Sequence, residues 1–530
     1  MRRIVFFLVV LFVAACGSTA VAQELAATLT GTVTDPSGAV VPGASVIVHS
    51  NATNSDVRTV STDASGNYAV TNLQPGDYTV IVKQSGFSTY SATNVVLLVA
   101  QKHTLDVQLQ TGQLSQTVTV QETTTPVQTT TAEQSGTVTG TQVRELALNN
   151  RNFEQLVLLQ PGVASQLPDE VGFGLANNTT ISVNGARPAA NNWTVDGADI
   201  NDSGSNATLL NVPSIDAIQE FTLERSTYDA QYGRSGGGQI LVATKAGTNE
   251  FHGDAYEFVR NNYFNANSFF GNAAGQPTPI ERYNDFGFTI GGPLFVPKLY
   301  QRQASKTYFF WSEEWRKSST PNTTTLTVPT TAELSGAFTS PIPVAPAGCV
   351  TASGGTYTIN PACYSANAKA YLNTIFAKNP ANTGPDTLTL NYSQLNNFRQ
   401  DILRVDQNIS DRIHFFGRVM QDSVPENQPF GLWGGNNYPG VETVSLNAPG
   451  KNAVGNLTWT ISPKVVNELE YAYSWGGINS VLNGIANSSS FTSHLTNATP
   501  YQDPYGRAPN IIFQTSGITG LANGSAPYFE

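Results

Sequence analysis

The sequence predicts a mainly β protein: a small N-terminal β-sandwich, a small α/β domain, and a series of antiparallel strands suited to a membrane. Three observations carry this prediction. Charged residues are only 12% of the 530 residues, about half the usual share, although the mean hydropathy is −0.17. The chain is rich in residues of turns and strands, with 46 Gly, 29 Pro, 20 Tyr and 26 Phe. No stretch approaches about 18 consecutive apolar residues, so any membrane crossing would use strands.

Charge and composition also exclude some classes of partner and site. The formal net charge of −11 argues against a nucleic-acid partner. The three Cys and five His are scattered along the chain, and none forms a cluster at metal-ligand spacing. We therefore expect neither a metal nor another cofactor.

The first 22 residues form a predicted secretory signal. Arg2 and Arg3 precede an apolar run from Ile4 to Ala15, which is too short to span a bilayer comfortably, and an A-x-A site ends at Ala22. A lipoprotein site that would leave a lipidated Cys16 is a competing interpretation. In both cases the protein leaves the cytoplasm.

Residues 24–111 are predicted to form the sandwich, because short alternating strands are separated by turns about every ten residues. Examples of the turns are Asp35-Pro36-Ser37-Gly38 and Asp63-Ala64-Ser65-Gly66. With the later Leu73-x-x-Gly76-x-Tyr78, these motifs resemble the carboxypeptidase regulatory-like domain. The resemblance implies a non-catalytic, transthyretin-like sandwich in which glycan binding is conceivable and a spacer role is the simpler expectation.

Residues 112–140 are predicted to be a flexible linker, since Thr, Gln and Ser dominate them and few apolar residues are present. Within the linker, Thr117-Val118-Thr119-Val120 is a short β-prone segment. A segment of this kind can pair with the edge of a partner's sheet, although four such residues also occur by chance.

Residues 141–247 carry the most specific pattern. A predicted short helix around Arg144 to Leu159 ends at Pro161-Gly162. The signature residues of this region are Asn149, Arg151, Asn152, Phe153, Asn184, Gly185, Arg187, Asn192, Asp196, Gly197, Tyr232, Gly233 and Arg234. This succession resembles the plug domain of the Oar-like group of TonB-dependent outer-membrane receptors. The resemblance implies a plug held inside a barrel, a TonB-type energy-transducing partner, and a TonB box for which Thr117 to Val120 is the candidate.

One motif in this region invites an enzymatic interpretation. Gly233-x-Ser235-x-Gly237 satisfies the hydrolase pattern G-x-S-x-G, which requires a strand before the serine and a helix after it. Here a strand is predicted at residues 239–244, after the serine. We therefore expect Ser235 to be a turn residue and the protein not to be an enzyme.

Residues 248–530 are predicted to form the first strands of an incomplete transmembrane antiparallel β-barrel. Apolar and polar residues alternate in segments of the length that membrane strands need. A half-buried soluble sheet would show the same alternation in any one strand, but the loop lengths, which alternate between long and short, favour a barrel. The seven expected strands lie near residues 250–260, 283–292, 305–315, 398–409, 412–421, 451–461 and 465–476.

Two further expectations concern this last part. Cys349 and Cys363 lie in the longest predicted loop, residues 316–397, and a disulfide between them is a hypothesis. Receptors of this group have larger barrels, and an odd number of strands cannot close with both edges paired. The resemblance therefore implies a C-terminally truncated chain.

The leading hypothesis is a receptor of the outer membrane, with its sandwich in the periplasm, that imports an external solute. The partners would be a TonB-type protein, outer-membrane lipid and a solute such as an oligosaccharide, a peptide or a siderophore. The abundant amides and aromatic residues favour neutral, hydrogen-bonding ligands. An adhesion or secretion-associated barrel without import remains the alternative. A secreted polysaccharide-active enzyme would instead require a carboxylate pair in a cleft.

Overall fold

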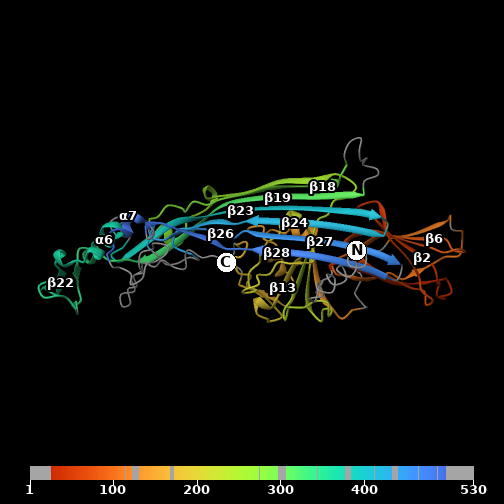
Figure 1. Cartoon of the computed structure of the whole chain (residues 1–530), viewed down its shortest axis with the longest axis horizontal. Coiled ribbons are helices and arrows are strands. Elements are labelled where there is room, and N and C mark those ends of the chain that lie inside the picture. The colour runs from red at the N-terminus through yellow and green to blue at the C-terminus, as the bar shows by residue number, and fades with distance from the viewer. Residues whose placement is uncertain are drawn as a thin grey trace, which may run out of the picture.

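The structure is a computed structural model of the whole chain. It describes residues 25–113, 115–121, 131–166, 172–273, 275–295, 306–342, 344–376, 384–410, 412–432, 438, 440–462, 465–485 and 488–496. The predicted signal segment and Cys16 lie outside the described residues. The predicted fold class is confirmed: a sandwich, a plug domain and a partial barrel follow one another (Figure 1).

The N-terminal sandwich consists of two sheets packed face to face. One sheet has the order β3-β2-β5-β6-β9, and the other has β4-β1-β7 with β8 also paired to β1. Alternate residues of each strand point inward, so Leu29, Val46 and Val80 are fully buried. The strands are β1 (Ala27–Thr34), β2 (Ser45–Ser50), β3 (Ser55–Ser61), β4 (Asn67–Leu73), β5 (Gly76–Lys83), β6 (Thr89–Leu97), β7 (Lys102–Thr104), β8 (Val107–Gln108) and β9 (Thr117–Gln121).

The plug domain is built on a five-stranded sheet of order β10-β15-β16-β13-β14. Phe153 lies at the centre of its core, edge-to-face with Trp193 at 6.0 Å and Phe221 at 5.7 Å between ring centroids. Its elements are β10 (Gln134–Thr139), α2 (Gly140–Glu145), α3 (Glu154–Val157), β11 (Val163–Ser165), β12 (Ile181–Val183), η1 (Pro188–Ala190), β13 (Asn192–Val195), β14 (Ala198–Asp199), η2 (Ile215–Ala217), β15 (Ile218–Ser226) and β16 (Gln239–Thr244).

Two expectations about this region need correction. The composition of residues 112–140 predicted a flexible linker with one β-prone segment, but β9 and β10 within it join the sandwich and plug sheets. These two strands are held in place by backbone pairing, which their side chains do not predict. Val138 of β10 is in addition buried in the plug core. The single predicted helix around residues 144–159 is instead two short helices, α2 and α3, separated by an irregular segment.

The barrel wall is one antiparallel sheet in which all seven predicted strands are neighbours, in the order β17-β18-β19-β23-β24-β27-β28. β25 and β26 extend it at one end together with β29, and these three were not predicted. Its elements are β17 (His252–Asn261), η3 (Asn262–Phe264), α4 (Phe269–Ala273), β18 (Arg282–Pro293), β19 (Thr307–Thr327), β23 (Thr387–Ser410), β24 (Ile413–Ser423), β25 (Pro425–Gln428), β26 (Thr443–Asn447), β27 (Gly450–Ser462), β28 (Val465–Gly476) and β29 (Asn479–Asn483).

The two faces of the wall have the polarity of a membrane barrel. On β24, Phe415 and Val419 are exposed on one face, whereas Arg418 and Asp422 are buried on the other. The plug domain lies against the face that carries the charges, beneath the long strands in Figure 1. Apolar side chains outward and charged side chains inward are typical of strands that face lipid. No α-helix of the described residues has the length and apolarity needed to cross a membrane.

The predicted loop at residues 316–397 is shorter than expected, because β19 and β23 continue well beyond the predicted strand ends. They pair over the whole length of β19, which has 21 residues. We call the end of the wall where β19 ends and β23 begins the loop end. The opposite end, where the Tyr308 hydroxyl donates to the Thr53 carbonyl of the sandwich, is called the sandwich end. The remaining elements lie beyond the loop end: α5 (Thr331–Leu334), β20 (Ala337–Phe338), β21 (Val350–Ser353), β22 (Thr356–Ile359), η5 (Pro361–Cys363), α6 (Ala366–Thr374) and α7 (Ser489–Thr492). Cys349 and Cys363 form a disulfide there, with their Cα atoms 5.8 Å apart.

Candidate functional site at the plug and barrel interface

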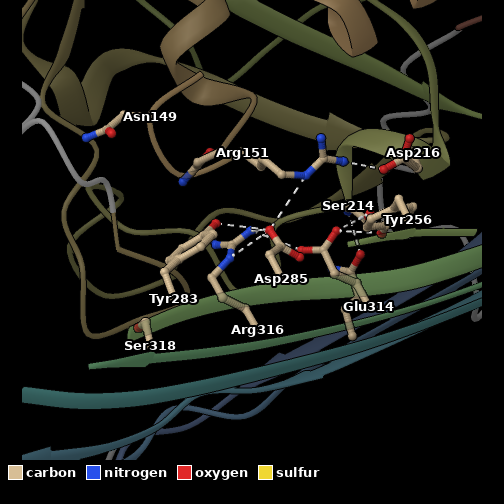
Figure 2. Close-up of polar contacts among 12 residues, drawn as sticks. Asn149, Arg151, Ser214, Asp216, Tyr256, Tyr283, Asp285, Glu314, Arg316 and Ser318 are labelled. Atoms are coloured by element: carbon tan, nitrogen blue, oxygen red, sulfur yellow. Dashed lines mark hydrogen bonds and ion pairs between the residues drawn. The ribbon is translucent and has the colours of Figure 1, made fainter. Parts of the chain in front are cut away.

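Arg151 links the plug to the wall. It stands in the irregular segment between α2 and α3 in a left-handed conformation, with φ of +53°, which directs its side chain away from the helices. The guanidinium forms an ion pair with Asp216 of the plug, and its Nε lies 3.6 Å from Asp285 Oδ2 on β18 (Figure 2). It also stacks 4.1 Å from the centroid of the Phe258 ring on β17. One plug cation is thus held by two carboxylates and an aromatic face.

Three charged residues of the wall continue this network. Arg316 on β19 donates to Asp285 Oδ2 from Nε at 3.1 Å and to Glu314 Oε1 at 3.0 Å. The plug reaches the same carboxylate, because the Ser214 hydroxyl donates to Glu314 Oε2 at 2.6 Å (Figure 2). Arg316, Asp285 and Glu314 are all buried. Together with Arg151 and Asp216 they form an ionic cluster, which we call the Arg151 cluster, and both the plug and the wall contribute charges to it.

A second ionic site lies nearer the sandwich end. Asp196 forms the turn between β13 and β14, where it and Gly197 both have positive φ, +49° and +87°. Its Oδ2 accepts from Arg418 Nε at 3.0 Å, and its Oδ1 lies 3.4 Å from Arg404 NH1. Both arginines project from wall strands, β24 and β23. The plug turn is therefore inserted between two cations of the wall.

The electrostatics of Asp196 follow from these partners. Burial alone would raise the pKa of its carboxyl, but Arg418, Arg404 and two hydrogen bonds from Thr244 hold that pKa below its usual value. The carboxylate is therefore ionised at neutral pH. At Gly197 the φ of +87° favours glycine, and a Cβ at this position would lie 2.6 Å from the Glu470 carboxylate of the wall, so the end of that side chain would have to move.

A cavity of about 440 Å³ opens beside the Arg151 cluster, toward the loop end. Its lining joins the plug residues Phe173 and Asn177 to wall residues whose side chains are mostly uncharged and hydrogen-bonding. Aromatic rings, including Tyr283 and Tyr392, and the charged Arg316 and Glu426 complete it; the amide and hydroxyl residues on the wall are Ser318, Thr320, Asn322, Thr324, Gln394, Asn396 and Gln428. Among the described residues, no group of three or more His, Cys, Asp or Glu side chains could hold a metal ion.

The structure brings four of the predicted signature residues to the wall: Arg151, Asp196, Gly197 and Asn149, whose backbone carbonyl accepts from Arg260 of β17 at 2.6 Å. Asn152 and Phe153 are buried within the plug. The other signature residues serve the plug's own turns and edges. Asn184 and Gly185 form a turn, Arg187 precedes η1, and Tyr232 packs near the sandwich. Gln239 contacts both the Asn192 side chain and the Gly233 carbonyl, and Arg234 forms an ion pair with exposed Asp199.

The wall side of the interface was not predicted from the sequence. The wall residues Arg404, Arg418, Arg316, Asp285 and Glu314 were absent from the predicted site because the strands were identified from their apolar residues. No local signal separates these charges from their neighbours, since other charged residues such as Glu313 and Lys317 lie beside them in the same strands.

Two other sequence-predicted segments have clear places. Thr117 to Val120 lie in β9, the outermost strand of the five-stranded sandwich sheet. Ser235 has no strand-turn-helix around it, and its hydroxyl donates to the carbonyls of Ala190 at 2.8 Å and Gly238 at 3.1 Å. It fastens a glycine-rich turn to the plug.

Comparison with known families gives three matches in chain order. The sequence matches the carboxypeptidase regulatory-like domain over residues 28–110, the TonB-dependent receptor plug domain over 119–239, and the outer membrane beta barrel domain over 243–530. The last match covers more than half of the chain.

The chain is also similar to individual proteins. The chain is 29% identical over 303 residues to the TonB-dependent transporter Oar of Myxococcus xanthus, which covers 54% of this chain and 27% of that protein. The chain thus spans about a quarter of that relative's length. Among solved structures, it is similar to the outer membrane transporter YddB of Escherichia coli, with 11% identity and a TM-score of 0.40 over 65% of this chain and 39% of that one. The ferric enterobactin receptor of Pseudomonas aeruginosa gives 11% identity and a TM-score of 0.34 over 65% and 46%.

Proposed function

The chain belongs to the outer membrane beta-barrel family and carries the plug of a TonB-dependent receptor, and from this premise we propose that it imports an external solute by an energy-coupled rearrangement of its plug. The proposal places the wall in the outer membrane and the sandwich in the periplasm, after removal of a signal peptide. Its partner is a TonB-type energy-transducing protein that pulls on Thr117 to Val120. No covalent chemistry is required.

The observation that carries the proposal is the ionic contact between plug and wall. Asp196 sits between Arg404 and Arg418, and Arg151 sits beside Asp285, so buried ion pairs join the plug to the wall beside apolar contacts such as that of Phe173 with Phe398. Charges that part in a water-filled lumen are rehydrated, which offsets much of the lost attraction. The ionic part of this interface is therefore suited to opening and closing again.

The cavity at the loop end supports a solute class. Its wall offers amide and hydroxyl groups together with Tyr283, Tyr392 and Phe430. Amides bind hydroxyl and peptide groups, and aromatic faces stack on sugar rings or on side chains of a ligand. An oligosaccharide or a peptide fits this lining, and a siderophore is a weaker candidate because Arg316 alone among the described lining residues provides positive charge.

The test is deletion of Thr117 to Val120 from the full chain expressed in its own cells. We expect uptake of fluorescently labelled oligosaccharide and peptide pools to be lost, as it is when a proton uncoupler is added to cells with the intact chain. Outer-membrane fractionation of the variant controls for insertion. Uptake that is unchanged by the deletion would contradict the proposal, and adhesion without any uptake by the intact chain would favour the adhesion alternative.

A further inference from the structure

The candidate TonB box is part of the sandwich sheet. β9 pairs in parallel with β6, and the register runs from Thr89 opposite Thr117 to Thr93 opposite Gln121. The pairing begins one residue earlier, where the Thr89 amide donates to the Gln116 carbonyl at 2.8 Å. A segment that a partner would have to reach is therefore already paired with another strand.

The chain before β9 fixes this register by close backbone contacts. Phe87 bridges Thr111, and the Ser88 amide donates to the Gln110 carbonyl at 2.8 Å. Gly112 lies so near Ser88 that a Cβ on it would be 2.1 Å from the hydroxyl oxygen. The return of the chain toward β6 is thus specified by the sequence, and β9 reaches the sheet in one alignment.

The attachment of β9 differs from that of its neighbours. The other strands of this sheet place alternate residues in the sandwich core, whereas all five residues of β9 are exposed. Val118 and Val120 remain 38% and 41% exposed, while Ala92, the β6 partner of Val120, is 1% exposed. Backbone hydrogen bonds therefore supply most of the attachment. Each such bond contributes only about 0.5–1.5 kcal/mol net, because it is exchanged for a bond to water. The attachment is therefore weaker than that of a strand with core side chains, and β9 can leave while the sandwich remains folded.

We propose that β6 sequesters the TonB box, so that the sandwich and the energy-transducing partner compete for β9. This inference rests on the proposed function, in which Thr117 to Val120 pair with the partner by strand addition. The partner would then meet an available box only in the fraction of molecules whose β9 has left β6. Its apparent affinity falls by that fraction, about tenfold or more if no more than about a tenth of the molecules are open.

A reversible covalent lock tests the inference. Ser91 and Thr119 are opposite each other, and neighbouring strands lie about 4.8 Å apart, within the span of a disulfide. With the double variant Ser91→Cys/Thr119→Cys in the full chain, we expect the purified periplasmic domain of a TonB-type protein to be captured only after reduction. The loss on oxidation should be tenfold or more.

Controls separate the lock from damage to the box. Each single variant should capture the partner domain alike with and without reductant, and so should the parent chain, whose Cys349–Cys363 disulfide is also reduced. A synthetic peptide of residues 113–122 provides a second measurement that needs no variant. Its affinity for the same partner domain should exceed that of the full chain by about tenfold or more.

The outcomes distinguish this inference from the proposed function. If deletion of Thr117 to Val120 leaves capture unchanged, the box itself is wrong. If the deletion abolishes capture but the oxidised double variant binds as well as the reduced one, the box is right and sequestration is overturned. The partner would then add to the outer edge of β9 while β9 stays on β6. Equal affinities of the peptide and the full chain would also overturn sequestration.

Discussion

The sandwich core and the plug interface are both deeply buried but differ in chemistry, since the interface combines ion pairs with apolar contacts whereas the sandwich core is apolar. Leu29 and Val80 in the sandwich have no exposed surface and only apolar neighbours in their cluster. Asp196 and Arg418 at the interface are 4% and 1% exposed, and their side chains are charged. Depth of burial alone therefore does not distinguish the two regions. The type of contact does.

This difference bears on the proposed displacement of the plug. Opening the sandwich exposes apolar surface to water, at a cost of about 25 cal/mol for each Å². Parting the ion pairs of the plug interface returns their charges to water, so the net stability that an intact ion pair provides is small, although loss of one partner is costly. Under the proposed function, the sandwich would remain folded under a pull while the ionic contacts of the plug open.

The strongest test of this comparison removes the Asp196 carboxylate. Asp196→Ala leaves Arg404 and Arg418 buried without their shared partner, and we expect the plug to be destabilised by about 3–5 kcal/mol. The change in plug stability is measured by urea unfolding of the full chain, with protease cleavage of the plug as the readout at each urea concentration. Asp196→Asn is the matched control, because it keeps the shape and can keep the Thr244 contacts. If Asn proved as stable as Asp, the charge would not hold the plug.

The next test addresses the apolar side of the comparison. Leu29→Ala removes a fully buried side chain from the sandwich and should lower the free energy of unfolding of that domain by about 3 kcal/mol. The plug transition should not move. Val40→Ala, at a position that is 47% exposed, is the control and should change little. Equal effects at both positions would mean that the sandwich has no specific core.

A smaller effect should appear with pH where sandwich and plug meet. The Glu220 carboxylate accepts from the Val99 amide at 2.5 Å, and burial raises its pKa to about 7 from an ordinary value of 4.5. Because the folded state keeps a proton that the unfolded state loses, stability falls as pH rises from about 4.5 to about 7 and is level above that. Glu220→Gln should remove this loss, by no more than about 3 kcal/mol. Urea midpoints at pH 5, 6, 7 and 8 measure it; parallel curves for variant and parent would contradict it.

The smallest change is expected at an exposed ion pair of the same plug. Arg234 pairs with Asp199, and their side chains are 58% and 37% exposed. Arg234→Ala should therefore lower plug stability by less than about 1 kcal/mol. The urea unfolding used for Asp196→Ala measures both variants under the same conditions. A loss comparable with that of Asp196→Ala would show that exposure does not control the strength of these pairs.

Much of the fold could be predicted because it depends on local patterns. Alternation along the chain marks strands with one apolar face, as on β27 and β28, and Asp63 with Gly66 marks a turn through bonds that its carboxylate accepts from nearby amides. The added lengths of β19 and β23 were missed because their ends are rich in Thr and Asn. There the two strands pair with each other, and Leu326 and Leu388 pack into an apolar cluster with Tyr371 of α6 and Phe491 of α7.

The site was only half predictable for a different reason. Arg151 and Asp196 lie in a recognisable plug pattern, but their wall partners are far away in sequence. Asp196 and Arg418 are separated by 222 residues, and no local pattern specifies such a pair. The pairing of β9 with β6 could not be predicted either, because it involves the backbone and depends little on the choice of side chains.

The lengths of β19 and β23 also set a height. At about 3.4 Å per residue, the 24 residues of β23 extend for about 80 Å. Even at a tilt of about 45° this is a rise of about 55 Å, against a hydrocarbon core of about 30 Å. The paired strands are therefore much longer than the hydrocarbon core is thick, and the disulfide-bonded β21–β22 region lies beyond their end. In the orientation that we propose, with the sandwich in the periplasm, a solute approaching the cell surface would meet this raised region before it reached the plane of the membrane.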